Sequence, residues 1–131
     1  MIGLDTNILV RYIAQDDPVQ SPIATNIVER CLTLHNPGFI SIVAVVETVW
    51  VLDRAYRLPA PTIVAAIERI LQTETFVVEN EQQVFTAMIA LKHGFGSFAD
   101  ALIAALGARA GCARTLTFDR KALSLPSFAL P

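Results

Sequence analysis

Four acidic residues, far apart along the chain, are the candidates for a metal site. They are Asp5, Glu47, Asp100 and Asp119. No histidine or cysteine lies within six residues of any of them. A set of side chains that offers only oxygen suits Mg²⁺ or Mn²⁺ and does not suit Zn²⁺. Such carboxylates hold metal ions for phosphodiester hydrolysis, in which the metal generates a hydroxide, orients the phosphate and stabilises the leaving oxygen.

Glu47 is unusual because of its surroundings. Between residues 42 and 52 only Glu47 and Thr48 are polar. A helix that is apolar all round is normally buried, and a carboxylate is almost never fully buried without a partner. Two interpretations remain open. Glu47 lies either on a solvated helix rim, where Arg54 or Arg57 could bridge to it, or in a polar pocket where carboxylates share a cation.

The other three acids also have purely structural interpretations. Asp5 follows a short apolar run, and both Asp5 and Asn7 are good helix caps. Ser97 and Asp100 have the spacing of a capping box. Asp119 follows the predicted strand Thr115–Phe118, in which threonines alternate with apolar residues, and can be an ordinary turn or cap residue.

The elements that must position these acids are short apolar runs that alternate with helical patterns. We expect strands at residues 2–4, 39–42, 75–78 and 115–118. We expect helices at residues 8–13, 18–34, around Glu47, from Pro61 through Leu71, at 81–93 and at 97–106, and a helical turn at 119–123. This alternation predicts an α/β fold, a three-layer α/β/α sandwich around a central, mainly parallel sheet of four or five short strands. The tail, residues 124–131, is not assigned to an element.

The predicted sheet would bring the acids together. Ligands bind at the carboxyl ends of the strands in open α/β sheets. Asp5 comes just after the first predicted strand and Asp119 just after the fourth. Glu47 lies in the helix after the second strand, and Asp100 lies in the first turn of its helix. All four can therefore converge on one end of the sheet.

Composition predicts one cytoplasmic domain spanning residues 1–131. Hydrophobic residues make up 53% of the chain, and the mean hydropathy is +0.51. This excess indicates that apolar surface is buried between chains. No apolar run approaches the roughly 18 residues of a membrane span, and the first residues carry no secretory signal. Cys31 and Cys112 are expected to be buried thiols in a reducing cytoplasm, and Trp50 is expected in the core.

Net charge does not exclude a nucleic-acid partner. The value of −2 argues weakly against one, because such proteins usually carry a basic face. If four of the 12 acidic residues gather at one site, however, the other eight stand against 10 Lys and Arg. The remaining surface is then mildly basic.

Four motifs, taken in order, resemble those of the PIN-domain family, and within it the VapC-type toxins of bacterial toxin–antitoxin pairs. The matching segments are Met1–Asn7, Val46–Leu52, Phe98–Ala105 and Leu116–Asp119. Each motif alone is weakly specific, but the four occur in order and at the usual spacing over essentially the whole chain.

The resemblance implies a metal-dependent ribonuclease. It makes the four acids the catalytic metal site, with Asp5 and Asp100 as the principal Mg²⁺ ligands. The supporting polar residues would be Thr6, Asn7, Ser97 and Thr117. Relatives often carry another acid where this chain has Ser97, which puts a fifth ligand and a strong second metal site in doubt. The resemblance also implies RNA as substrate, a cognate antitoxin as inhibitor and a homodimer as the unit.

Two other functions stay open. A phosphatase or phosphotransferase can use an Asp at the end of a strand as its nucleophile, as Asp5 would be. That arrangement usually has a second Asp two residues later, where this chain has Asn7. A catalytically inactive PIN-like binding module is the other alternative, and the presence of all four acids counts against it. The glycine-rich loops that bind nucleotide cofactors are absent.

Overall fold

The structure, a computed structural model, describes residues 1–131. Residue contacts divide the chain into two compact units, Met1–Glu79 and Asn80–Pro131, and each is described by itself. Both contain helices and parallel strands, so the predicted α/β class is confirmed.

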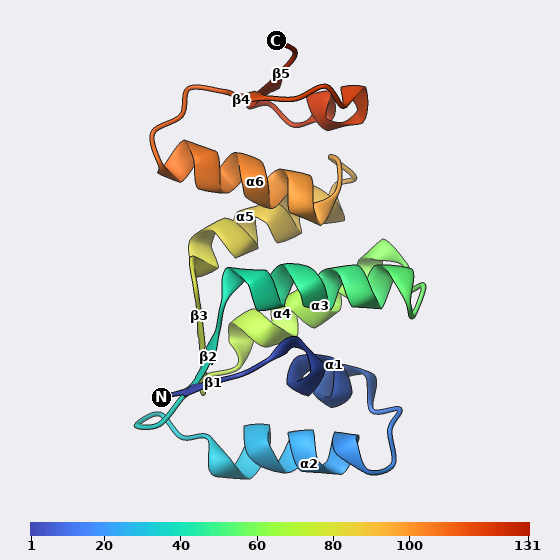
Figure 1. Ribbon diagram of the computed structural model, residues 1–131, viewed down its shortest axis with the longest axis vertical. Coiled ribbons are helices and arrows are strands. Elements are labelled where there is room, and N and C mark those ends of the chain that lie inside the picture. The colour runs from blue at the N-terminus through green and yellow to red at the C-terminus, as the bar shows by residue number, and fades with distance from the viewer. The chain divides into compact units, whose positions relative to one another are not determined.

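The first unit alternates strands with helices (Figure 1). Its elements are β1 (Ile2–Gly3), α1 (Thr6–Ala14), α2 (Gln20–Asn26), the π-helix η1 (Ile27–Cys31), β2 (Gly38–Ile40), α3 (Ile42–Arg54), α4 (Ala60–Gln72) and β3 (Phe76–Val78). The strands form one parallel sheet in the order β1-β2-β3. Because all three run the same way, their carboxyl ends lie at one edge, and α1 and α3 both begin there.

The core of this unit is made by aliphatic side chains from the sheet and the helices. The largest fully buried ones are Leu9, Ile40, Val45, Leu52 and Ile67. In α4 the buried positions 63, 64, 66, 67 and 70 fall on one side of the helix, as a 3.6-residue period requires. Burial of a side chain of this size stabilises the fold by roughly 1.5–3 kcal/mol.

Side chains cap both helices that begin at the sheet edge. Asp5 Oδ1 accepts a hydrogen bond from the Thr6 backbone N–H at 2.8 Å. Ser41 Oγ accepts from the Ala44 N–H at 3.1 Å, and the Ile42 N–H donates to Glu79 Oε1 at 2.9 Å. These bonds satisfy donors that a helix cannot satisfy internally, so they fix where α1 and α3 start.

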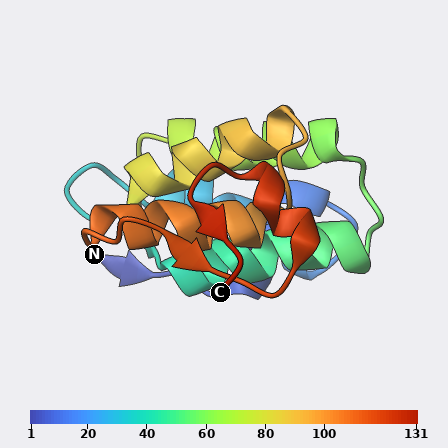
Figure 2. The same cartoon turned by 90° about the horizontal axis from the view of Figure 1, so that it is seen from above.

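The second unit pairs two helices and two short strands. Its elements are α5 (Glu81–Lys92), α6 (Phe98–Arg109), β4 (Thr115–Leu116), the 3-10 helix η2 (Arg120–Ser124) and β5 (Phe128–Ala129). Helices α5 and α6 pack against each other. The glycines of the connecting turn, Gly94 and Gly96, have φ of 76° and 75°, which favours glycine. Strands β4 and β5, red in Figure 2, pair in parallel, so the tail that the sequence left unassigned forms a strand.

Some details differ from the sequence predictions. The five strands form a sheet of three and a sheet of two, where the sequence predicted one central sheet. Cys31 and Cys112 are exposed thiols rather than buried ones. Trp50, predicted in the core, is 61% exposed. Val43, seven residues earlier on the same helix, is 65% exposed. The prediction was wrong because one side of α3 remains open although nearly all of its residues are apolar. No helix in the chain has the length and apolar character needed to cross a bilayer.

Candidate functional site

A cleft of about 380 Å³ lies between α1, α3 and the turn after α3. Its lining residues are Asp5, Thr6, Asn7, Val10, Arg11, Glu47, Val51 and Tyr56. Two of the four candidate acids, Asp5 and Glu47, and two of the supporting polar residues, Thr6 and Asn7, therefore share one cavity. This is the part of the predicted site that lies within the first unit.

Parallel strand pairing positions the two acids. Asp5 follows β1, and Glu47 lies on the helix that follows β2, so both approach the same sheet edge. A hydrogen bond joins them indirectly, because Thr6 Oγ1 donates to Glu47 Oε1 at 2.9 Å. Glu47 is exposed, which explains how an apolar helix tolerates its charge. It forms no ion pair with Arg54, which instead lies 3.7 Å from Asp53.

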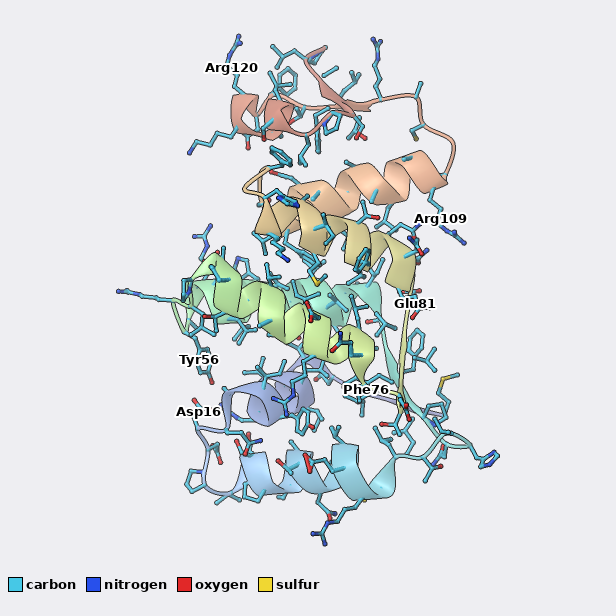
Figure 3. All side chains as sticks on the ribbon, turned by 180° about the vertical axis from the view of Figure 1, so that it is seen from behind. Asp16, Tyr56, Phe76, Glu81, Arg109 and Arg120 are labelled. Atoms are coloured by element: carbon cyan, nitrogen blue, oxygen red, sulfur yellow. The ribbon has the colours of Figure 1, made fainter.

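One cation lies among the residues that line this cleft. Arg11 Nη1 donates to the Tyr56 hydroxyl at 3.3 Å and lies 3.5 Å from Asp16 Oδ1. Arg11 Nε donates to Gln20 Oε1 at 2.9 Å. The Tyr56 hydroxyl donates to Asp16 Oδ2 at 2.8 Å, and Figure 3 shows these two side chains pointing toward one another. This bond to a carboxylate raises the pKa of Tyr56, so the phenol stays neutral at physiological pH.

The other candidate acids lie in the second unit, and the structure shows how each sits locally. Ser97 is the N-cap of α6, and its Oγ accepts from the Asp100 backbone N–H at 3.1 Å. Asp100 contributes its N–H, not its carboxylate, to this bond. Asp119 is itself a cap, because its Oδ1 accepts from the Lys121 N–H at 2.9 Å. The Asp119 N–H donates to Thr117 Oγ1 at 3.0 Å, so Thr117 shapes the turn that carries Asp119.

Sequence reasoning missed three polar residues, of which Arg11 and Tyr56 line the cleft and Glu79 caps α3. Glu79 directly follows β3, as Asp5 follows β1, so its position after an apolar run was a usable signal. Arg11 lies four residues after Asn7 and therefore on the same face of α1. Tyr56 follows the end of α3, and no pattern in the sequence predicts that it meets Arg11.

The cleft fits a hard divalent cation by its ligand chemistry. Asp5 and Glu47 offer carboxylate oxygens, Asn7 offers an amide oxygen, and no histidine or cysteine lines the cavity. Mg²⁺ and Mn²⁺ prefer such donors. Within each unit, no group of three acidic, histidine or cysteine side chains gathers as a ready-made site. The first unit thus supplies two carboxylates of the predicted four.

A larger hollow of about 450 Å³ runs along α4 but is a poorer candidate. Its only charged lining residues are Glu68 and Arg69. The guanidinium of Arg69 lies over the Tyr12 ring, 4.7 Å from its centroid, and so is already engaged. Volume alone does not identify a site, and the convergent polar groups are in the smaller cleft.

Comparison with known proteins gives one positive result. A family model described as PIN domain matches residues 2–126. This range covers almost the whole chain and includes all eight candidate site residues. Among curated proteins, none matches the sequence at a significant level.

Ser97 caps α6 through its hydroxyl, whereas the Asp100 carboxylate takes no part in that cap. Substitutions of the two residues should therefore have different effects on stability. Ser97→Ala should destabilise the protein by about 0.5–2 kcal/mol whether or not metal is present, because it removes a helix cap. If Asp100 shares a pocket with other carboxylates, as the motifs imply, Asp100→Asn should leave stability in EDTA unchanged or higher, because it relieves repulsion between like charges. In Mg²⁺ at a hundred times Kd, the parent should gain about 2.7 kcal/mol and Asp100→Asn should lose most of that gain.

Thermal or denaturant unfolding of the three proteins in EDTA and in Mg²⁺ measures these effects. An equal loss for Asp100→Asn under both conditions would make Asp100 a structural residue and reduce the predicted quartet to three acids.

Proposed function

The chain belongs to the PIN-domain family, whose members are generally metal-dependent nucleases, and on this premise we propose that it is a Mg²⁺- or Mn²⁺-dependent endoribonuclease. One observation within the structure carries the proposal. Asp5 and Glu47, which are far apart in sequence, line the same cleft at the carboxyl edge of a parallel sheet. That edge is where ligands bind in open α/β folds.

The residues of the cleft have distinct roles in this proposal. Asp5 and Glu47 would hold the metal, with Asn7 as a further oxygen donor. Thr6 holds the Glu47 carboxylate through its hydroxyl, so the acid is oriented before metal binds. A bound divalent cation activates water and neutralises charge on the phosphate.

The resemblance of the motifs implies two further ligands, which lie in the second unit. Asp100 and Asp119 are proposed as ligands because they match the third and fourth motifs of the family. Thr117 and Ser97 would then act through the backbone bonds that fix the turns around these two acids.

Asp5→Asn tests the chemistry without removing the helix cap. Asparagine caps a helix about as well as aspartate, so α1 should keep its first turn while the cleft loses one of its charges. We expect cleavage of a single-stranded RNA in Mg²⁺ to fall by at least roughly a hundredfold, and chelator to abolish cleavage by the parent. The readout is the initial rate of RNA cleavage.

Asp17→Asn is the matched control. Asp17 Oδ1 accepts from the Val19 and Gln20 N–H groups at 2.9 and 2.7 Å, so it is also a capping carboxylate, but it does not line the cleft. These bonds lower the pKa of Asp17. The control should cleave at the parental rate. Near-normal cleavage by folded Asp5→Asn protein would refute the nuclease proposal, and a phosphoryl group trapped on Asp5 would favour phosphotransfer instead.

The assembly proposed for this nuclease is a homodimer. The hydrophobic fraction of 53% is high for a chain of 131 residues, and α3 leaves Val43 and Trp50 open on one side. Two active sites would share a basic groove, so cleavage should weaken steeply as salt rises. Mass measurement in solution at micromolar protein is expected to give the dimer. A monomeric mass would contradict the assembly and leave the chemistry intact.

We further propose that the nuclease is the toxin of a toxin–antitoxin pair, on the resemblance of its motifs to the VapC type. The cognate antitoxin should inhibit by placing an arginine against Asp5 and Glu47, because a guanidinium matches a carboxylate with two parallel hydrogen bonds. Substituting that arginine should relieve inhibition, measured as RNA cleavage in the complex. An antitoxin that binds only away from these two carboxylates would contradict this mode of inhibition.

A further inference from the structure

Arg11 lies where two hollows of the first unit meet. One is the cleft of about 380 Å³ that contains Asp5 and Glu47. The other, of about 190 Å³, is lined by Asn7, Ile8, Arg11, Gln20, Ile23 and Ala24. Asn7 and Arg11 line both, so the two hollows adjoin along α1. An RNA strand that ran from Asp5 and Glu47 along this face of α1 would pass the guanidinium of Arg11.

The charges along this path favour an anion at Arg11. The lining of the first hollow contains two carboxylates and one cation, and that cation is Arg11. In the second hollow Arg11 is the only charged residue, beside the amide of Gln20 and the apolar surface of Ile23. The acids of the cleft repel a phosphodiester, and Asp16, 3.5 Å from Arg11, offsets part of the positive charge, so any attraction at this junction comes from the guanidinium itself.

The guanidinium is held in place and still has donors to offer. Arg11 Nε donates a hydrogen bond to Gln20, and Nη1 donates to Tyr56 and Asp16. The Asp16 contact is long, at 3.5 Å, and therefore weak. The second terminal nitrogen, Nη2, keeps two N–H groups for another acceptor. A pre-positioned guanidinium loses less entropy on binding than a mobile one, and the two free N–H groups of Nη2 can donate to a phosphate.

We propose that Arg11 binds a phosphate of the RNA strand adjacent to the scissile bond and so sets the strand's path from the carboxylates into the second hollow. This inference rests on the proposed ribonuclease function. The competing interpretation is structural: Arg11 ties the end of α1 to the start of α2 and to the turn after α3.

RNA binding across a salt series distinguishes the two roles. The probe is a fluorescently labelled single-stranded RNA of mixed sequence, kept in EDTA so that it is not cleaved. Arg11→Ala should weaken binding by about tenfold or more, as loss of a charge-assisted contact does. It should also reduce the slope of log K against log salt by about 0.7, the share of one phosphate contact on a single strand. Arg11→Lys should keep the slope and bind with intermediate affinity, because it keeps the charge and loses the planar group that Gln20 and Tyr56 hold in place.

Two further variants serve as controls. Arg30→Ala removes the same charge from an exposed position outside both hollows, so it should change affinity and slope far less than Arg11→Ala. Asp16→Asn removes a partner of Arg11 while keeping the guanidinium. It should leave binding unchanged or tighter if Arg11 contacts phosphate. If Arg11 is only a tie, Arg11→Ala should weaken binding without changing the salt slope.

The outcomes separate this inference from the function on which it rests. An active parent whose Arg11→Ala variant binds RNA like Arg30→Ala would overturn the Arg11 assignment and leave the nuclease standing. Weakening by Arg11→Ala with the parental salt slope would overturn it in favour of the tie. A parent that neither cleaves nor binds RNA would overturn both. A parent that binds without cleaving would refute the nuclease, and its salt slopes would still decide the role of Arg11.

Discussion

The parallel pairing of β1 with β2 determines where the chemistry can occur. It is made by few bonds, among them those from the Ile2 N–H to the Pro37 carbonyl and from the Leu4 N–H to the Phe39 carbonyl, both 2.9 Å. Because the strands run the same way, the chain leaves each at the same edge. A slip of one residue would turn every side chain of β1 to the opposite face. The relation of α1 to α3, and hence of Asp5 to Glu47, depends on this register.

Several polar groups at this edge serve the fold and the cleft together. Asp5 caps α1 and lines the cleft, and Thr6 opens the same helix and holds Glu47. Glu79, which follows β3, accepts a hydrogen bond from the Ile42 N–H in the first turn of α3. The structural and functional interpretations of a carboxylate are therefore not exclusive. A residue that fixes a helix start also fixes the direction of the side chains that follow it.

Local patterns in the sequence predicted the elements well, and long-range relations poorly. Apolar runs and caps depend on neighbours within a few residues, so the strand–helix alternation and the capping role of Asp5 were predictable. The exposure of Trp50 depends on which side of α3 is covered, which no local pattern encodes. The meeting of Arg11 with Tyr56 depends on how α1 packs beside α3. The strand within residues 124–131 has only two residues, too few for any alternation to be visible. The convergence of all four acids remains a prediction.

The cap at Asp5 has a consequence for how this fold can change over evolutionary time. Aspartate and asparagine codons differ by a single base, and asparagine satisfies the same backbone N–H at the start of α1. A descendant can thus lose this carboxylate in one mutational step with its helix start intact. Copies that keep the fold and lose this charge are therefore accessible in a single step.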